Sequence, residues 1–133
     1  MEKQSELSVI THAKELCSYI LTVTEKSPKK FRFTLVSRMQ NYSLTIIESL
    51  LIANEVRVLG RDGQVRRERL EERRDYQQKA FTNMKLLGFM AQTSMDQGCI
   101  LPKQYEQITR KLYDCQNLLG AWVRSDNKRY AGG

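Results

Sequence analysis

Residues 102–123 read PKQYEQITRKLYDCQNLLGAWV, and this stretch decides the fold class. Its apolar side chains recur at alternating steps of three and four residues, and they are Tyr105, Ile108, Leu112, Cys115, Leu119 and Trp122. That spacing puts all of them on one face of an α-helix, and such a face is buried against other elements of the fold. Pro102 suits the first turn of this helix, where its missing N–H costs no hydrogen bond.

Three earlier segments show the same periodicity, and the breaks between segments carry helix-ending signals. Ser27 precedes Pro28, and the residue before a proline avoids the helical conformation. Gly60 and Gly63 belong to a turn after the second segment, and Gly98 follows the third segment where glycine commonly ends a helix. We therefore predict four helices, at about residues 5–26, 29–59, 65–97 and 103–127.

Short breaks between long amphipathic helices are typical of antiparallel neighbours. The chain of 133 residues thus predicts an all-α, up-down-up-down antiparallel four-helix bundle. It forms a single domain over residues 1–129, with a basic flexible tail at residues 124–133. The second and third helices are the longest, so their hairpin is expected to overhang one end of the bundle.

Three arginines lie on the apolar lines of the second and third helices where these extend into the overhang, namely Arg57, Arg66 and Arg73. Charged residues are almost never buried unless they are paired. We therefore expect these arginines to face water, a partner subunit or an anion.

Neither a membrane nor an oxidising compartment is indicated. The longest uninterrupted apolar run is residues 50–53, whereas a membrane-spanning helix needs about 20 apolar residues. The first residues lack the basic-then-apolar pattern of a signal peptide. The cysteines, Cys17, Cys99 and Cys115, are odd in number and not spaced for zinc. These features predict a cytoplasmic protein with free thiols, of which Cys17 and Cys115 lie on core faces.

Catalytic motifs are also lacking. His12 is the one histidine, and the Glu-x-x-His motif of di-iron bundles fails because position 9 is Val9. The first arginine, Arg32, follows His12, which argues against helical nucleases that place an arginine before a histidine. Gly60 and Gly63 lack the Lys-Ser/Thr pair of a phosphate-binding loop. We therefore predict a protein that is not an enzyme, with no metal, no cofactor and no small-molecule substrate.

The charge favours a polyanionic partner. The chain holds 22 Lys and Arg against 15 Asp and Glu, a net charge of +7. Residues 26–47 contain five basic side chains and no acid, with Phe31 and Phe33 interleaved. These phenylalanines either stack on nucleic-acid bases or attach the helix to the core. Residues 66–75 mix both signs at helical spacing, which also fits a salt-bridged, solvated helix.

An antiparallel bundle places the basic tail beside the hairpin of the second and third helices, whereas the basic stretch at residues 26–38 lies near the opposite end. This convergence in space predicts binding of RNA or DNA at phosphates. The candidate nucleic-acid-binding or polymerase-binding residues are Lys29, Lys30, Arg32, Arg38, Arg57, Arg61, Arg66, Arg67, Arg73, Arg74, Arg124, Lys128 and Arg129.

Two motifs then carry a resemblance to a known family. Residues 26–35 read KSPKKFRFTL, at the entry to the second helix, and residues 118–124 read LLGAWVR, before the basic tail. The chain resembles the small four-helix-bundle proteins that include the ribosomal RNA intervening-sequence protein and the accessory variability determinant of diversity-generating retroelements. Residues 43–49 read SLTIIES and lack the Ser-Ile-x-x-Asn-Ile-Ala-Glu-Gly run of the intervening-sequence branch. The likeness is therefore closer to the accessory variability determinant.

This resemblance implies a pentameric barrel of four-helix protomers that is not itself catalytic. It also implies two partners, a reverse transcriptase and its template RNA, in mutagenic retrohoming. Apart from the resemblance, the wide apolar face of the second helix predicts a homo-oligomer, through Leu44, Ile47, Leu51 and Ile52. The alternative is an oligomeric helical adaptor, or an intervening-sequence-type protein, with no polymerase partner.

Overall fold

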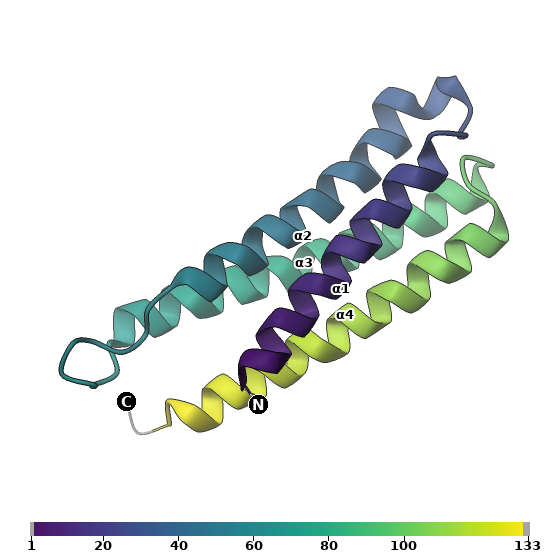
Figure 1. The fold of residues 1–133 in the computed structure, drawn as a ribbon. Coiled ribbons are helices and arrows are strands. Elements are labelled where there is room, and N and C mark those ends of the chain that lie inside the picture. Colours follow the sequence, from purple (N-terminus) through teal and green to yellow (C-terminus); the bar gives the residue numbers. More distant parts are fainter. Residues whose placement is uncertain (1, 132–133) are drawn as a thin grey trace.

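The computed structural model describes the backbone of residues 2–131 and the side chains of residues 8–131. Over this range the chain is all-helical, and its four long helices form a bundle in which each helix runs antiparallel to the next (Figure 1). The helices are α1 (Glu2–Thr24), α2 (Ser37–Glu55), α3 (Arg67–Asp96) and α4 (Pro102–Arg129). The predicted fold class is confirmed.

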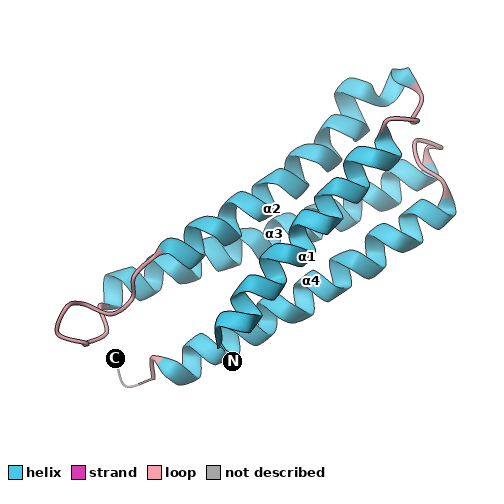
Figure 2. Ribbon diagram, viewed as in Figure 1, coloured by secondary structure: helices cyan, strands magenta, loops and turns pink. Residues whose placement is uncertain are grey.

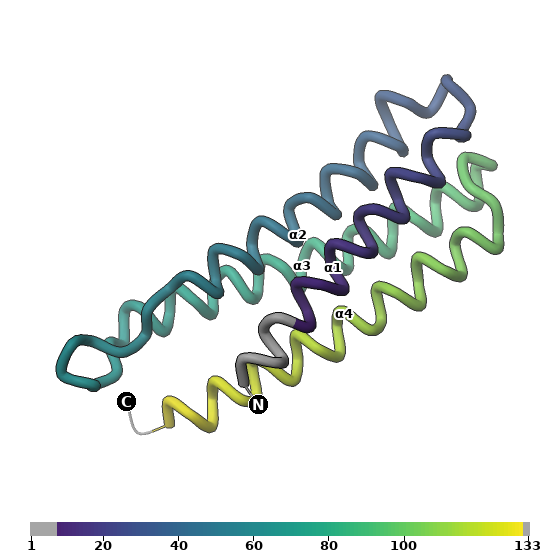
Figure 3. The backbone as a smooth tube through the Cα atoms, in the orientation of Figure 1, coloured from purple at the N-terminus to yellow at the C-terminus, as the bar shows by residue number. Residues whose placement is uncertain are grey.

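The backbone reverses direction at each of three connections, as the tube in Figure 3 shows. Neighbours in sequence are neighbours in space, and α4 closes the bundle by packing against α1. The α2–α3 connection and the last turns of α4 extend beyond the start of α1 (Figure 1). The overhang was predicted, but not its cause, because α2 has 19 residues and is the shortest of the four helices.

The core follows the predicted periodicity. On α4, Tyr105 is partly buried and the other five members of the predicted face are buried. Cys17, Cys99 and Cys115 are buried free thiols. Burial raises the pKa of the Cys115 thiol to about 12, so this sulfur stays protonated at neutral pH and is a poor nucleophile or metal ligand.

The second predicted helix is split at its start. Residues Lys29–Phe31 form a short 3-10 helix, η1, and residues Arg32–Val36 form a π-helix, η2, which continues into α2. Ser27 anchors this region, because its hydroxyl donates a hydrogen bond of 2.8 Å to the carbonyl of Cys99. The connection between α1 and α2 is therefore tied to the connection between α3 and α4.

The second predicted helix also ends early. We predicted helix to residue 59, but α2 ends at Glu55 and residues 56–66 form an extended loop (Figure 2). In this loop Val56 and Val58 are buried while Arg57 is exposed, an alternation of period two that suits extended backbone. A bridge between Leu59 and Val65 closes the loop.

The expected flexible tail is also corrected. α4 continues to Arg129, and Tyr130 is buried against Val58 and Leu70. This aromatic contact holds the end of the chain against the α2–α3 loop, so residues 124–130 are ordered on the bundle. Gly132 and Gly133 lie outside the described residues.

Candidate nucleic-acid interface

Basic side chains gather at both ends of the bundle. We call the end that holds residues 56–66 and 124–130 the hairpin end, and the end that holds residues 25–36 and 97–101 the turn end. The thirteen candidate residues therefore form two groups rather than one site. The turn-end group, with Arg38 from the following turn of α2, is Lys29, Lys30, Arg32 and Arg38.

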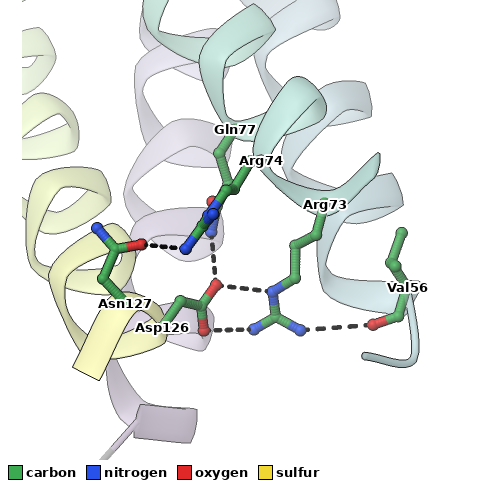
Figure 4. A network of polar contacts seen from close by, with 6 residues as sticks. All are labelled: Val56, Arg73, Arg74, Gln77, Asp126 and Asn127. Carbon is green, nitrogen blue, oxygen red and sulfur yellow. Dashed lines mark hydrogen bonds and ion pairs between the residues drawn. The ribbon is translucent and has the colours of Figure 1, made fainter. Parts of the chain in front are cut away.

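A buried ion pair organises the hairpin end (Figure 4). The Arg73 guanidinium on α3 donates two hydrogen bonds to the Asp126 carboxylate on α4, from Nε to Oδ2 at 2.8 Å and from Nη2 to Oδ1 at 3.0 Å. Gln77 donates a third hydrogen bond to Asp126 Oδ2, at 3.0 Å. Arg73 is 5% exposed and Asp126 is 1% exposed.

The same guanidinium reaches two further groups. Its Nη1 donates to the carbonyl of Val56 at 3.4 Å, and its Cζ lies 5.0 Å from the centroid of the buried Trp122 ring. One side chain thus joins α3, α4 and the first residue after α2. It fixes the start of the 56–66 loop against α4, where the exposed cations of both segments lie.

The placement of Arg73 corrects our expectation for this residue. We expected it to face water, a partner subunit or an anion, but it is buried and Asp126 neutralises it within the same chain. Asp126 lies four residues after Trp122, so it continues the apolar face of α4. This spacing could have predicted the ion pair, because an acidic and a basic side chain that both face inward can neutralise each other. Arg73 is therefore not exposed to contact an external ligand.

The remaining hairpin-end candidates lie at the surface. Exposed basic side chains come from the loop, from the first turns of α3 and from the last turns of α4, and they are Arg57, Arg61, Arg66, Arg67, Arg74, Arg124, Lys128 and Arg129. Arg74 donates to the Asn127 amide at 2.8 Å (Figure 4), which joins α3 to α4 a second time without neutralising the arginine. Within the mixed-sign stretch 66–75, Arg69 and Glu72 form an exposed ion pair at 3.2 Å.

The turn end is built differently. Lys29, Lys30 and Arg32 are exposed, and in the described part of the chain none of them forms an ion pair. Lys30 Nζ lies 5.1 Å from the centroid of the Phe31 ring, and Arg38 donates to the Tyr42 hydroxyl at 3.5 Å. These cations keep their full charge for an external ligand.

A polar pocket of about 430 Å³ lies at the turn end, between the end of α1 and η2. Gln40 donates a hydrogen bond of 3.0 Å to the Thr24 hydroxyl within it. Its lining consists of Thr24, Glu25, Ser27, Pro28, Lys29, Arg32, Val36 and Gln40. The pocket therefore combines two cations, one carboxylate and several uncharged polar groups.

Among residues 8–131, no three His, Cys, Asp or Glu side chains come together in a way that could hold a metal ion. His12 is half-buried on α1, with its Nδ1 2.8 Å from the Ser8 carbonyl oxygen. No helix in the described range combines the length and apolar content that crossing a bilayer requires.

Neither a protein-family model nor a curated protein matches this sequence.

Proposed function

We propose that this protein is a non-catalytic, basic, nucleic-acid-binding accessory protein. In this proposal it associates with a reverse transcriptase and its template RNA in the mutagenic retrohoming of a diversity-generating retroelement. The observation that carries the proposal is the hairpin end, where exposed cations of three segments stand on a backbone fixed by the Arg73–Asp126 pair. A backbone fixed in this way favours binding of a polyanion, because the loop loses little conformational freedom on binding.

The chemistry of the hairpin end suits phosphates rather than base edges. Lysine and arginine that neutralise phosphates release counterions, so the affinity falls steeply with salt. Contacts to phosphate oxygens position a protein on nucleic acid but carry no sequence information. We therefore expect the hairpin end to bind RNA and duplex DNA with similar strength.

The polymerase partner rests on the resemblance of residues 26–35 and 118–124 to the accessory variability determinant. A reverse transcriptase is usually basic itself, so a basic accessory protein needs either an acidic patch on the enzyme or RNA that joins the two. Two basic ends on one bundle allow two ligands to be held at once. The protein would act in the cytoplasm without a metal, a cofactor or a small-molecule substrate.

The proposal includes a homopentamer. Supporting it, Leu44 is 51% exposed and Leu51 is also exposed on α2, and an apolar stripe of this kind commonly marks a subunit interface. Light scattering on the purified chain tests this part of the proposal. A pentamer is expected to give five times the chain mass of 15.5 kDa, and Leu44→Glu should dissociate it. A 15.5 kDa particle at micromolar concentration contradicts the assembly.

The central experiment measures binding of template RNA and of duplex DNA by fluorescence anisotropy at several salt concentrations. We expect affinity to fall steeply between about 50 and 200 mM salt. The triple variant Arg124→Glu, Lys128→Glu, Arg129→Glu should weaken RNA and duplex DNA binding alike. A control with Lys103→Glu, at the far end of α4, should keep more of the affinity. Binding that is absent or indifferent to salt overturns the nucleic-acid function.

The exposed stripe on α2 also favours the second candidate, an oligomeric helical adaptor whose charge serves solubility. A pull-down with the reverse transcriptase, with and without nuclease, separates the two candidates. An accessory protein is expected to be retained with the polymerase at least in the presence of RNA. An adaptor would form the oligomer and retain neither the polymerase nor RNA.

A further inference from the structure

We propose that the turn end holds an unpaired nucleotide of a single-stranded nucleic acid, with its base stacked on Phe33 and its phosphate held by Lys29 and Arg32. The inference rests on the proposed nucleic-acid function and adds to it a preference for single strands. The hairpin end offers exposed cations but, within residues 56–66 and 124–130, no exposed aromatic ring, so it suits any phosphate backbone. The turn end adds an aromatic face that only an unpaired base can reach.

The π-helix explains why Phe33 is outside the core. Phe31 packs against the core from the end of η1, and Val36 is buried five residues later. One turn of a π-helix spans more residues than one turn of an α-helix, so Phe31 and Val36 both face inward. The residues between them include Arg32, Phe33 and Thr34, and all three are exposed. π-helical turns occur frequently at functional sites.

The two phenylalanines of this segment therefore have different environments. Phe31 attaches the segment to the core and carries Lys30 over its ring. Phe33 is 87% exposed, the largest exposed fraction among the large apolar side chains described. Packing within the described chain does not use the ring at position 33, so the ring is available to contact a ligand.

The neighbours of Phe33 indicate which ligand fits. Lys29 and Arg32 line the turn-end pocket and form no ion pair in the described part of the chain. Six of the eight residues that line the pocket are polar or charged, which suits a phosphate and a ribose hydroxyl better than an apolar anchor from a protein. Arg32 and Phe33 are adjacent in the chain, about 3.8 Å apart at Cα. An exposed cation and an exposed aromatic ring on neighbouring residues can contact the phosphate and the base of one nucleotide.

Aromatic side chains that stand beside unpaired cations are the usual means of binding single strands without reading sequence. In a duplex each base face is covered by its neighbours, so Phe33 would add nothing to duplex binding. In the proposed complex, RNA bound at the turn end would join this basic protein to a basic polymerase. This arrangement needs no acidic patch on the enzyme.

The test compares a labelled oligouridylate dodecamer with a duplex of equal length at fixed salt. Phe33→Ala should weaken binding of the oligouridylate at least fivefold, within the range of about 5- to 150-fold expected for the loss of one stacked base. Phe33→Leu should weaken it nearly as much, because leucine is apolar but cannot stack. Duplex affinity should stay unchanged in both variants. The control is Tyr113→Ala, since Tyr113 is 63% exposed on α4, and this variant should bind both probes as the wild type does.

A second readout reports stacking directly. The one native tryptophan, Trp122, is fully buried, so Phe33→Trp adds a single surface indole. Its fluorescence should be quenched by oligouridylate and not by the duplex, while wild-type fluorescence stays constant. Circular dichroism confirms that each variant is folded.

Three results would overturn the inference. The first is a Phe33→Ala variant that binds the oligouridylate at wild-type strength, and the second is one that loses duplex affinity to the same extent as oligouridylate affinity. The third is a Phe33→Ala variant that still binds single strands but no longer retains the polymerase after nuclease treatment, which would make Phe33 a contact for a protein. If the wild-type protein binds neither probe, the proposed nucleic-acid function fails as a whole. If it binds both and Phe33 is silent, only the stacking site fails.

Discussion

Both ends of the bundle carry exposed basic side chains, but different structures hold these side chains in place. At the hairpin end a buried arginine and a buried aspartate hold a loop and a helix end together, and the surface cations stand around them. At the turn end the cations stand on η1 and η2, with no ion pair of their own in the described part of the chain. Two surfaces that both carry positive charge can therefore suit different ligands, because the backbone that carries the cations sets how they are arranged.

This difference has a direct consequence for ligand choice. The hairpin end fixes its cations over several segments, which suits an extended phosphate backbone of any kind. The turn end offers a short basic segment, a polar pocket and an exposed ring, which suits a single flexible nucleotide. We expect variants at each end to separate these two kinds of binding.

The largest effect is expected from breaking the buried pair. Arg73→Met leaves the Asp126 carboxylate buried without its partner, which should lower the free energy of unfolding by about 3–5 kcal/mol. Urea denaturation followed by circular dichroism measures this change. The matched control is Arg69→Met, which removes an exposed ion pair on the same helix and should cost less than about 1 kcal/mol. Equal losses in the two variants would show that the Arg73 network is no more than a surface pair.

An intermediate effect is expected when both members of the pair are replaced. Buried ion pairs can be replaced by apolar side chains of similar volume with little loss of stability. The double variant Arg73→Met, Asp126→Leu should thus recover most of the stability but lose the hydrogen bond to the Val56 carbonyl. The freed loop must then be ordered on binding, which should lower duplex affinity by about two- to tenfold.

The readout of this double variant is specific to one end. Hydrogen exchange should become faster in residues 56–66, whereas stacking at Phe33 should stay as in the wild type. A folded double variant with full duplex affinity would mean that the pair stabilises the bundle without positioning the loop.

The sequence predicted the helices and the core well because helical periodicity is a local property. The face of α4 from Tyr105 to Trp122 is packed in the core as predicted, and Gly88 lies in close contact with α4, since a Cβ there would be 3.3 Å from Leu112 Cδ2. Both follow from the spacing of residues along one helix. The placement of the two basic ends also followed, because antiparallel order fixes which segments meet.

The sequence did not predict features that depend on two segments far apart in the chain. Arg73 and Asp126 are 53 positions apart, and periodicity gives the inward face of each helix without pairing the residues on it. The end of α2 was missed because no proline or glycine stands between Glu55 and Gly60 to signal it. Only the contacts of Val58 with Leu70 and Tyr130 select the extended form. The π-helix was not predicted, because no residue type in the sequence around residues 32–36 marks an extra residue per turn.

The smallest effect is expected from two glycines, one at each end. Gly63 in the hairpin loop and Gly98 after α3 both have φ of +79°, and a Cβ at either position would meet nothing within 4 Å. Alanine at either position should therefore cost only the backbone strain, about 1–2 kcal/mol. Asparagine tolerates this conformation better and should cost less than alanine at both positions. The two ends should differ in binding, since Gly63→Ala disturbs the loop that carries Arg57, Arg61 and Arg66, whereas Gly98→Ala lies away from it. Equal duplex affinity in both alanine variants, at equal losses of stability, would show that the conformation of the 56–66 loop does not set the strength of phosphate binding.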